Sequence, residues 1–155
     1  MTIRRAEKDD IPALSELLRQ VCNVHSQGRP DLFKPDGTKY TPEQLAELIQ
    51  DDSRPIFVAD TGEGVKGYAF CMFKQHLDDT CVTDVKTLYI DDLCVDEHCR
   101  GRGIGRALYE FVVQFARKSG CYNVTLNVWC CNTSAIKFYE SCGLIPQKIG
   151  MEKVL

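Results

Sequence analysis

The amino-acid sequence predicts an α/β (α+β) fold with a single mixed β-sheet of six to seven strands and about four flanking helices. Strand-like runs rich in Val, Ile, Phe and Tyr alternate with segments whose apolar residues recur at helical spacing. A Gly-containing turn within residues 55–75 indicates a β-hairpin, the antiparallel part of the sheet. Residues 88–129 read as strand, helix and strand, a crossover unit whose two strands are expected to be parallel.

The first half of the chain predicts a strand and two helices. The strand covers residues 2–6, and Asp9 or Asp10 can cap the helix that follows. That helix has apolar residues at helical spacing, namely Ile11, Leu14, Leu17, Leu18 and Val21. Residues 22–39 hold two Gly and two Pro among polar residues, which predicts a loop or broken helix of the length that is usually functional or disordered. A second helix starts after Thr41, with Pro42 at its first position and Gln44 completing a capping box.

The second half predicts a strand at residues 87–95, a helix, a strand at 123–129, a short helix and one or two closing strands. The first helix follows a glycine-rich turn and closes near Gly120. Its core-facing residues are Ile104, Ala107, Leu108, Phe111, Val112 and Phe115. Asn132 is the expected cap of the short helix at 133–141, which Gly143 ends, and residues 144–155 supply the closing strands.

Length and charge narrow the class of protein. A chain of 155 residues is expected to form one domain, residues 1–155. Its net charge of −3 argues against a nucleic-acid partner and favours a cationic one. The N-terminus lacks a signal-peptide core, and no apolar run approaches the ~18 residues of a spanning helix, so we expect a cytoplasmic protein with no membrane partner.

Nine cysteines are scattered through the sequence. Most lie inside apolar patterns, where a free cysteine behaves as a small hydrophobe, and an odd number fits a reducing compartment. Neither Cys94 with Cys99 nor the pair Cys130 and Cys131 has the C-x₂-C spacing of a zinc site. We therefore predict no metal.

The turn "RGRGIGR", residues 100–106, carries the clearest functional signal. Backbone N–H groups at the start of a helix lack intrahelical partners and attract anions, and glycines let a phosphate approach them. Arg100, Arg102 and Arg106 add positive charge. A Walker loop is excluded because no Gly-Lys-Ser/Thr follows, and a dinucleotide fold is disfavoured because Leu108 stands where a third small residue should be. The turn predicts a phosphate-bearing ligand.

These residues resemble the GNAT superfamily of N-acetyltransferases. "LCVDEHCRGRGIGRAL" is similar to its coenzyme A motif, Arg/Gln-x-x-Gly-x-Gly/Ala, filled here by Arg100, Gly103 and Gly105. "NVWCCNTSAIKFYESCGL" is similar to its C-terminal signature, and this half most resembles ribosomal-protein alanine acetyltransferases. That signature is matched by Asn132, Ala135, Phe138, Tyr139, Glu140, Gly143 and Leu144. The resemblance implies a centrally splayed sheet and an acetyl-CoA-dependent N-acetyltransferase.

The resemblance also implies roles for individual residues. The pyrophosphate of acetyl-CoA would bind the backbone amides of Arg100, Gly101, Arg102, Gly103, Ile104, Gly105 and Arg106. The main chain of Leu93 and Val95 would bind the pantetheine arm, and Asn132 would touch the cofactor. The N–H of Cys94 or Val95 would stabilise the oxyanion formed by amine attack on the thioester, and Tyr139 would protonate the leaving thiolate.

The general base is the open question in this sequence. The resemblance to ribosomal-protein alanine acetyltransferases places Asn127 where those enzymes have a glutamate, and an asparagine cannot accept a proton at neutral pH. Asp91 and Asp92 are the nearest substitutes, and strand alternation is expected to place them on opposite faces. We choose Asp92, on the face of Ile90 and Cys94; the alternative is that both acids are solvated or attract a cationic substrate while water removes the proton.

The acceptor cannot be identified from the sequence. Residues 25–40 fall where the family has its variable substrate loop, and His25, Phe33 and Tyr40 could line an acceptor pocket. Equally, Phe33 could pin the loop to the core and leave His25 exposed. A small amine and a protein N-terminus are both open as acceptors, and a homodimer rests on family analogy only. Because of Asn127, a catalytically idle coenzyme A-binding or regulatory module is the alternative function.

Overall fold

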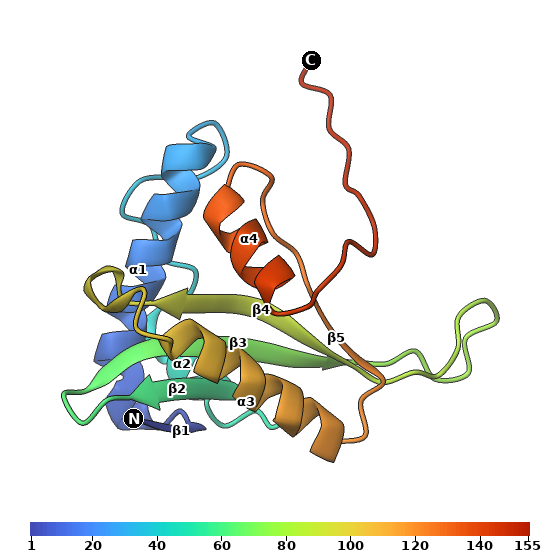
Figure 1. Cartoon of the computed structure of the whole chain (residues 1–155), viewed down its shortest axis with the longest axis horizontal. Helices are drawn as coiled ribbons and strands as arrows, with labels where there is room; N and C mark the ends of the chain where they lie inside the picture. Colours follow the sequence, from blue (N-terminus) through green and yellow to red (C-terminus); the bar gives the residue numbers. More distant parts are fainter.

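The computed structural model describes all 155 residues, and its centre is one five-stranded mixed sheet (Figure 1). The strands lie in the order β1 (Thr2–Arg5), β2 (Ile56–Asp60), β3 (Val65–Lys74), β4 (Thr87–Val95) and β5 (Asn123–Leu126). The first three pairs are antiparallel, and β4 pairs with β5 in parallel. The mixed α/β class, the hairpin and the parallel crossover are therefore confirmed.

The predicted number of six to seven strands is wrong. No strand forms in residues 144–155, and β5 ends at Leu126 instead of Trp129. The Trp129 carbonyl instead accepts the Asn132 N–H at 2.8 Å, in the turn that leads into the next helix. Pro146 has no N–H to offer a strand partner, and β5 presents only four residues for pairing.

Four helices flank the sheet: α1 (Ile11–Gly28), α2 (Pro42–Leu48), α3 (Ile104–Lys118) and α4 (Thr133–Ser141). Helix α1 runs seven residues beyond Val21, so the prediction of an irregular segment from residue 22 is wrong in its first part. Polar side chains are tolerated there, and the helix ends only where Gly28 and Pro30 occur. The capping box at Thr41 is confirmed: its hydroxyl accepts the Gln44 N–H, and the Gln44 side chain accepts the Thr41 N–H. No helix is long and apolar enough to span a membrane.

The two faces of the sheet carry separate cores. Helices α1 and α2 cover one face, where Leu14, Leu18, Leu45 and Tyr68 are fully buried. Helix α3 covers the other face, where Phe57, Leu88 and Val112 are fully or almost fully buried. Burying one such side chain stabilises the fold by about 1.5–3 kcal/mol, so both faces of the central strands are firmly held.

Strand β4 is irregular at its centre, and this positions the site. Phe70 pairs with Asp92 while the next residue, Cys71, pairs with Ile90, so Asp91 is an extra residue in β4. Such a β-bulge shifts the alternation of side chains that follow it. On the other edge of β4, pairing with β5 stops at Ile90 and Leu126. From there to Val95, β4 stays paired with β3 but has no partner on the β5 side. The sheet is thus splayed between β4 and β5.

Candidate active site

The free stretch of β4 exposes backbone groups at the point where β5 diverges. The Asp96 N–H donates to the Lys66 carbonyl of β3 at 2.9 Å. Because backbone groups alternate in direction along an antiparallel strand, those of Leu93 and Val95 point away from β3 and those of Cys94 point toward it. Of the two oxyanion donors considered from the sequence, Val95 is therefore the better placed. Its carbonyl accepts the Arg100 Nε–H at 3.3 Å, and its N–H faces the splayed side.

The glycine turn lies at the wide end of this opening, between a 3₁₀ turn (Glu97–Cys99) and α3. Gly101 and Gly103 have φ of +76° and +80°, a left-handed conformation that strains any residue with a Cβ. An added Cβ at either position would have no atom within 4 Å, so the space above the turn is open. The N–H groups of Arg100, Gly101, Arg102 and Gly103 form no hydrogen bond within the chain, and α3 begins directly behind them. Free N–H groups at the start of a helix are donors of the kind that bind anions.

Both carboxylates of the acidic pair reach the same face of the sheet. The Asp92 carboxylate accepts the Tyr68 hydroxyl at 2.9 Å, on the α1 side with Cys94. The Asp91 carboxylate accepts the Tyr40 hydroxyl at 3.3 Å, and Tyr40 packs on that same α1 side. The expectation of opposite faces is wrong, and so is the grouping of Asp92 with Ile90, which packs on the α3 side. The bulge at Asp91 is the cause.

The surroundings of Asp92 change its acidity. Burial raises the pKa of its carboxyl to about 6, against the hydrogen bond from Tyr68 and the positive charge of Lys39, which lower it. The negative charge of Asp91 contributes to the increase. A carboxylate with a pKa near 6 is ionised at neutral pH and yet more basic than an ordinary aspartate.

Tyr139 lies on α4 close to this carboxylate. Burial raises the pKa of its hydroxyl well above the ordinary range, and the negative charge of Asp92 raises it further. Its ring meets the ring of Phe138 edge to face at 5.1 Å. Tyr139 is thus neutral and holds its proton over the physiological pH range. At the start of α4, Asn132 accepts the Ala135 N–H at 3.1 Å, which confirms it as the helix cap.

The loop of residues 29–41 packs over the acidic pair. Lys39 Nζ lies 2.7 Å from a carboxylate oxygen of Asp91, and Tyr40 stacks on Phe70 at 5.6 Å. The Phe33 ring lies against those of His25 and Trp129, with centroids 5.0 and 5.4 Å away, so it ties the loop to these two residues and not to the buried core. His25, now part of α1, is partly buried, and burial with the charge of Lys39 lowers its pKa. His25 and Asn132 also line a cavity of about 330 Å³ between α1 and α4.

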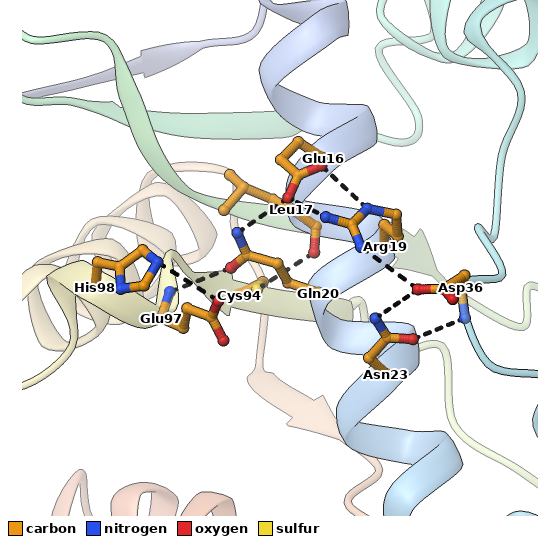
Figure 2. Close-up of polar contacts among 9 residues, drawn as sticks. All are labelled: Glu16, Leu17, Arg19, Gln20, Asn23, Asp36, Cys94, Glu97 and His98. Carbon is orange, nitrogen blue, oxygen red and sulfur yellow. Dashed lines mark hydrogen bonds and ion pairs between the residues drawn. The ribbon is translucent and has the colours of Figure 1, made fainter.

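Helix α1 forms hydrogen bonds both to this loop and to the segment before the glycine turn (Figure 2). Asn23 donates to the Asp36 carboxylate at 3.1 Å and accepts the Asp36 N–H at 2.8 Å, which fixes Asp36 in a left-handed conformation. On the other side, Gln20 accepts the Glu97 N–H at 3.1 Å, just before the glycine turn. One helix therefore sets the position of both walls of the site.

Two site residues were not found by sequence reasoning, Tyr68 and Lys39. Tyr68 sits in a hairpin strand with no motif around it, and only the pairing of β3 with β4 brings it to Asp92. Lys39 lies in the irregular loop, where spacing carries no information. Asn127, predicted to lie inside a strand, follows the end of β5, and its side-chain amide donates to the Tyr89 hydroxyl at 3.1 Å. No cluster of three or more potential metal ligands gathers in the structure.

Known proteins with similar sequences include N-acetyltransferases. Glucosamine 6-phosphate N-acetyltransferase from Arabidopsis thaliana is 35% identical over 68 residues, which are 44% of this chain and 44% of that protein. The match thus spans less than half the length of that relative. Thialysine N-epsilon-acetyltransferase from Bos taurus is 23% identical over 149 residues, covering 91% of this chain and 82% of that protein.

A solved structure matches the whole fold. The crystal structure of a tetramutant of the BH1408 protein from Bacillus halodurans has a TM-score of 0.94 and 31% identity, and the match covers 100% of both chains. The model of the acetyltransferase (GNAT) family matches residues 18–144, which include the glycine turn, β4 and α4. The chain therefore belongs to the GNAT family of acetyltransferases, enzymes whose co-substrate is acetyl-CoA.

Proposed function

We propose that this enzyme transfers the acetyl group of acetyl-CoA to a primary amine by direct attack in a ternary complex, with Asp92 as general base and Tyr139 as general acid. One observation carries the proposal: a partly buried carboxylate with a raised pKa lies near enough to a partly buried, neutral tyrosine to raise that tyrosine's pKa, where β4 and β5 diverge. Two titratable groups whose surroundings give them opposite proton-transfer roles are the usual arrangement for acid-base catalysis.

The proposed binding of acetyl-CoA rests on backbone groups that have no hydrogen-bond partner within the chain. The N–H groups of residues 100–106 bind the pyrophosphate, aided by the charges of Arg100, Arg102 and Arg106 and by the helix dipole of α3. Leu93 and Val95 pair with the pantetheine arm as an added strand would. Asn132, at the start of α4, closes the other side of the opening.

Asp92 and Tyr139 divide the proton transfers. Asp92 accepts a proton from the acceptor ammonium, and the nitrogen lone pair then attacks the thioester carbonyl carbon. The Val95 N–H stabilises the oxyanion. Tyr139 donates its proton to the departing thiolate as the C–S bond breaks, and it recovers a proton from the new amide nitrogen. The reaction leaves an acetamide, free coenzyme A and one proton released through Asp92.

The acceptor is proposed to be a small cationic amine. Two carboxylates face the acceptor side, and an ammonium group of the protein itself, that of Lys39, is already held by Asp91. Thialysine and glucosamine 6-phosphate, the substrates in the names of two relatives, both carry a primary amine. His25, Phe33 and Tyr40 shape the wall that selects among such amines.

Thiol release from acetyl-CoA, measured across a panel of small amines and N-terminal peptides, tests this function. We expect turnover with at least one small amine and a mass increase of that amine by one acetyl group. Binding of acetyl-CoA without turnover on any acceptor would instead favour the idle coenzyme A-binding module that Asn127 allows.

Changing Tyr139 to Phe is expected to lower kcat by about 10²-fold, the usual contribution of a general acid. The Kd of acetyl-CoA, measured by calorimetry, should stay unchanged because the ring remains in place. Tyr122→Phe is the matched control, since its side chain is exposed and its loss of a hydroxyl should leave kcat unaltered. Equal kcat values for the two variants would remove Tyr139 from the mechanism.

Changing Tyr68 to Phe is expected to move the acid limb of the kcat/KM profile to higher pH. The Tyr68 hydroxyl donates to the ionised Asp92 carboxylate and so lowers its pKa, and without this bond the pKa rises above its value of about 6. The measurement is kcat/KM from pH 5 to 9. A limb that stays in place, or moves down, would contradict the assignment of Asp92 as the titrating base.

A further inference from the structure

The side chain of Lys39 lies where the acceptor amine is proposed to react. Its Nζ is 2.7 Å from a carboxylate oxygen of Asp91, which also accepts the Tyr40 hydroxyl at 3.3 Å. Asp92, the proposed base, is the next residue, and the bulge brings it to the same face of the sheet. The protein therefore supplies a primary ammonium group of its own to the acidic pair.

The chain beside Lys39 is held in place by Tyr40. The Tyr40 ring stacks on Phe70 with the ring centroids 5.6 Å apart, and its hydroxyl accepts an N–H of Arg54 at 3.3 Å. Thr41, the next residue, is the cap of α2. Lys39 is thus presented to the acidic pair from an anchored end of the loop of residues 29–41.

The Lys39 ammonium faces groups from α1, from β4 and from its own loop. Burial lowers the pKa of His25, and the charge of Lys39 lowers it further; the same charge opposes the burial that raises the pKa of Asp92. Nζ lies 5.6 Å from the centre of the Tyr40 ring. The side chain is still 43% exposed, so a co-substrate can approach it. Lys39 therefore combines access from solvent with a carboxylate base close by.

We propose that Lys39 is itself an acceptor and that the enzyme acetylates its Nζ from acetyl-CoA when no other amine is bound. This inference rests on the proposed function, because it uses the same base, acid and co-substrate. Asp92 takes a proton from the Lys39 ammonium, and the nitrogen lone pair forms a bond to the thioester carbonyl carbon. The C–S bond breaks, and the thiolate takes a proton from Tyr139, which recovers one from the new amide nitrogen. The products are an acetylated Lys39, free coenzyme A and one proton released through Asp92.

Acetylation changes the site because it removes the charge of Lys39 and with it the ion pair to Asp91. The Asp91 carboxylate is then free to hold the ammonium of an incoming acceptor. The KM for a cationic acceptor is expected to fall by roughly two- to fivefold, as the loss of a competing, partly exposed ion pair predicts. Lys39→Gln, whose side chain is uncharged like an acetylated lysine, should show the same decrease. An unchanged or higher KM in this variant would overturn the release of Asp91.

Mass spectrometry of the full chain, incubated with acetyl-CoA alone, tests the modification. One acetyl group per chain is expected on Lys39, and trypsin, which does not cut after an acetylated lysine, should no longer cut there. Lys39→Arg is expected to take up no such group. Lys34→Arg is the matched control, since Lys34 is an exposed lysine of the same loop, and this variant should still be acetylated at Lys39.

The Asp92→Asn chain separates catalysed from spontaneous acetylation. Without the base, its Lys39 is expected to react about 10²–10⁴-fold more slowly than that of the wild type. Equal rates in the two proteins, or equal rates at Lys39 and Lys34 in the wild type, would show a spontaneous reaction and overturn the inference.

A mixture of Asp92→Asn with Lys39→Arg tests whether the transfer occurs within one chain. The first chain has the lysine but no base, and the second has the base but no lysine. Lys39 of the Asp92→Asn chain should react no faster in the mixture than alone. Its acetylation by the other chain would overturn the assignment of Lys39 to the site of its own chain.

The inference and the proposed function fail in different ways. If the wild type acetylates small amines and Lys39 stays unmodified, the inference is overturned and the proposed function stands. If Lys39 is acetylated through Asp92 and no small amine is, the proposed small-amine acceptor fails and the inference stands.

Discussion

Replacing Asp92 with Asn is expected to lower kcat/KM by about 10²–10⁴-fold, the contribution of a general base. Asparagine keeps the shape of the side chain and can still accept the Tyr68 hydroxyl, so the fold and the affinity for acetyl-CoA should be retained. Steady-state kinetics with the best acceptor of the panel provides the measurement.

Asp91→Asn is the matched control for this change. Asp91 is the neighbouring acid on the same face, and its carboxylate is held by Lys39 and Tyr40. Its replacement is expected to raise KM for a cationic acceptor while kcat falls less than tenfold. A larger loss of kcat for Asp91→Asn than for Asp92→Asn would reverse the two assignments.

The Asp92→Asn variant is also expected to be more stable than the wild type at pH 7 and above. The folded-state pKa of about 6 lies above the ordinary value of 3.8, so the native state binds this proton more tightly than the unfolded state. At pH values between these two pKa values, the free energy of unfolding falls as the pH rises. A pKa difference of this size corresponds to a loss of on the order of 1–3 kcal/mol in the free energy of unfolding. Thermal unfolding of both proteins at pH 5 and pH 8 measures this difference in stability. If the variant were less stable than the wild type at pH 8, the ionised Asp92 carboxylate would not destabilise the fold.

Replacing Gly103 with Val is expected to weaken acetyl-CoA binding at least 100-fold, a loss of about 2.7 kcal/mol or more. Gly103 has φ of +80° and caps α3, and a β-branched residue there distorts the turn and places methyl groups where the phosphates approach. Calorimetric titration with acetyl-CoA, and separately with coenzyme A, measures the loss.

Gly120→Val separates strain from lost binding. Gly120 follows the other end of α3, also has a positive φ, and has no atom within 4 Å of an added Cβ. Both variants should therefore lose similar stability, but only Gly103→Val should lose affinity. Unchanged affinity in Gly103→Val would remove the glycine turn from the cofactor site.

The parts of the fold that are determined by residues close together in the sequence were predictable. The capping box at Thr41, the hairpin and the glycine turn are each written within a few consecutive residues, and so the sequence alone indicates them. The length of α1 was missed because its last two turns are rich in polar residues, which a helix tolerates. The helix ends only at Gly28, two residues before Pro30.

The parts that depend on pairing between distant segments were not predictable. The extra residue at Asp91 exists only relative to β3, and this single bulge brings both carboxylates to one face. Likewise, Tyr68 and Asp92 are 24 positions apart and meet across the strand pair. The closing strands were predicted from an apolar pattern in residues 144–155, but these residues form no strand, because an apolar pattern does not by itself supply a neighbouring strand to pair with.

The pH dependence of kcat/KM, compared between the wild type and Asp92→Asn, tests the central claim most directly. The wild type is expected to lose activity as the pH falls through about 6, because protonated Asp92 cannot accept a proton. In Asp92→Asn this limb should be absent and the residual activity should be far lower. An identical limb in the two proteins, at similar activity, would show that Asp92 is not the base.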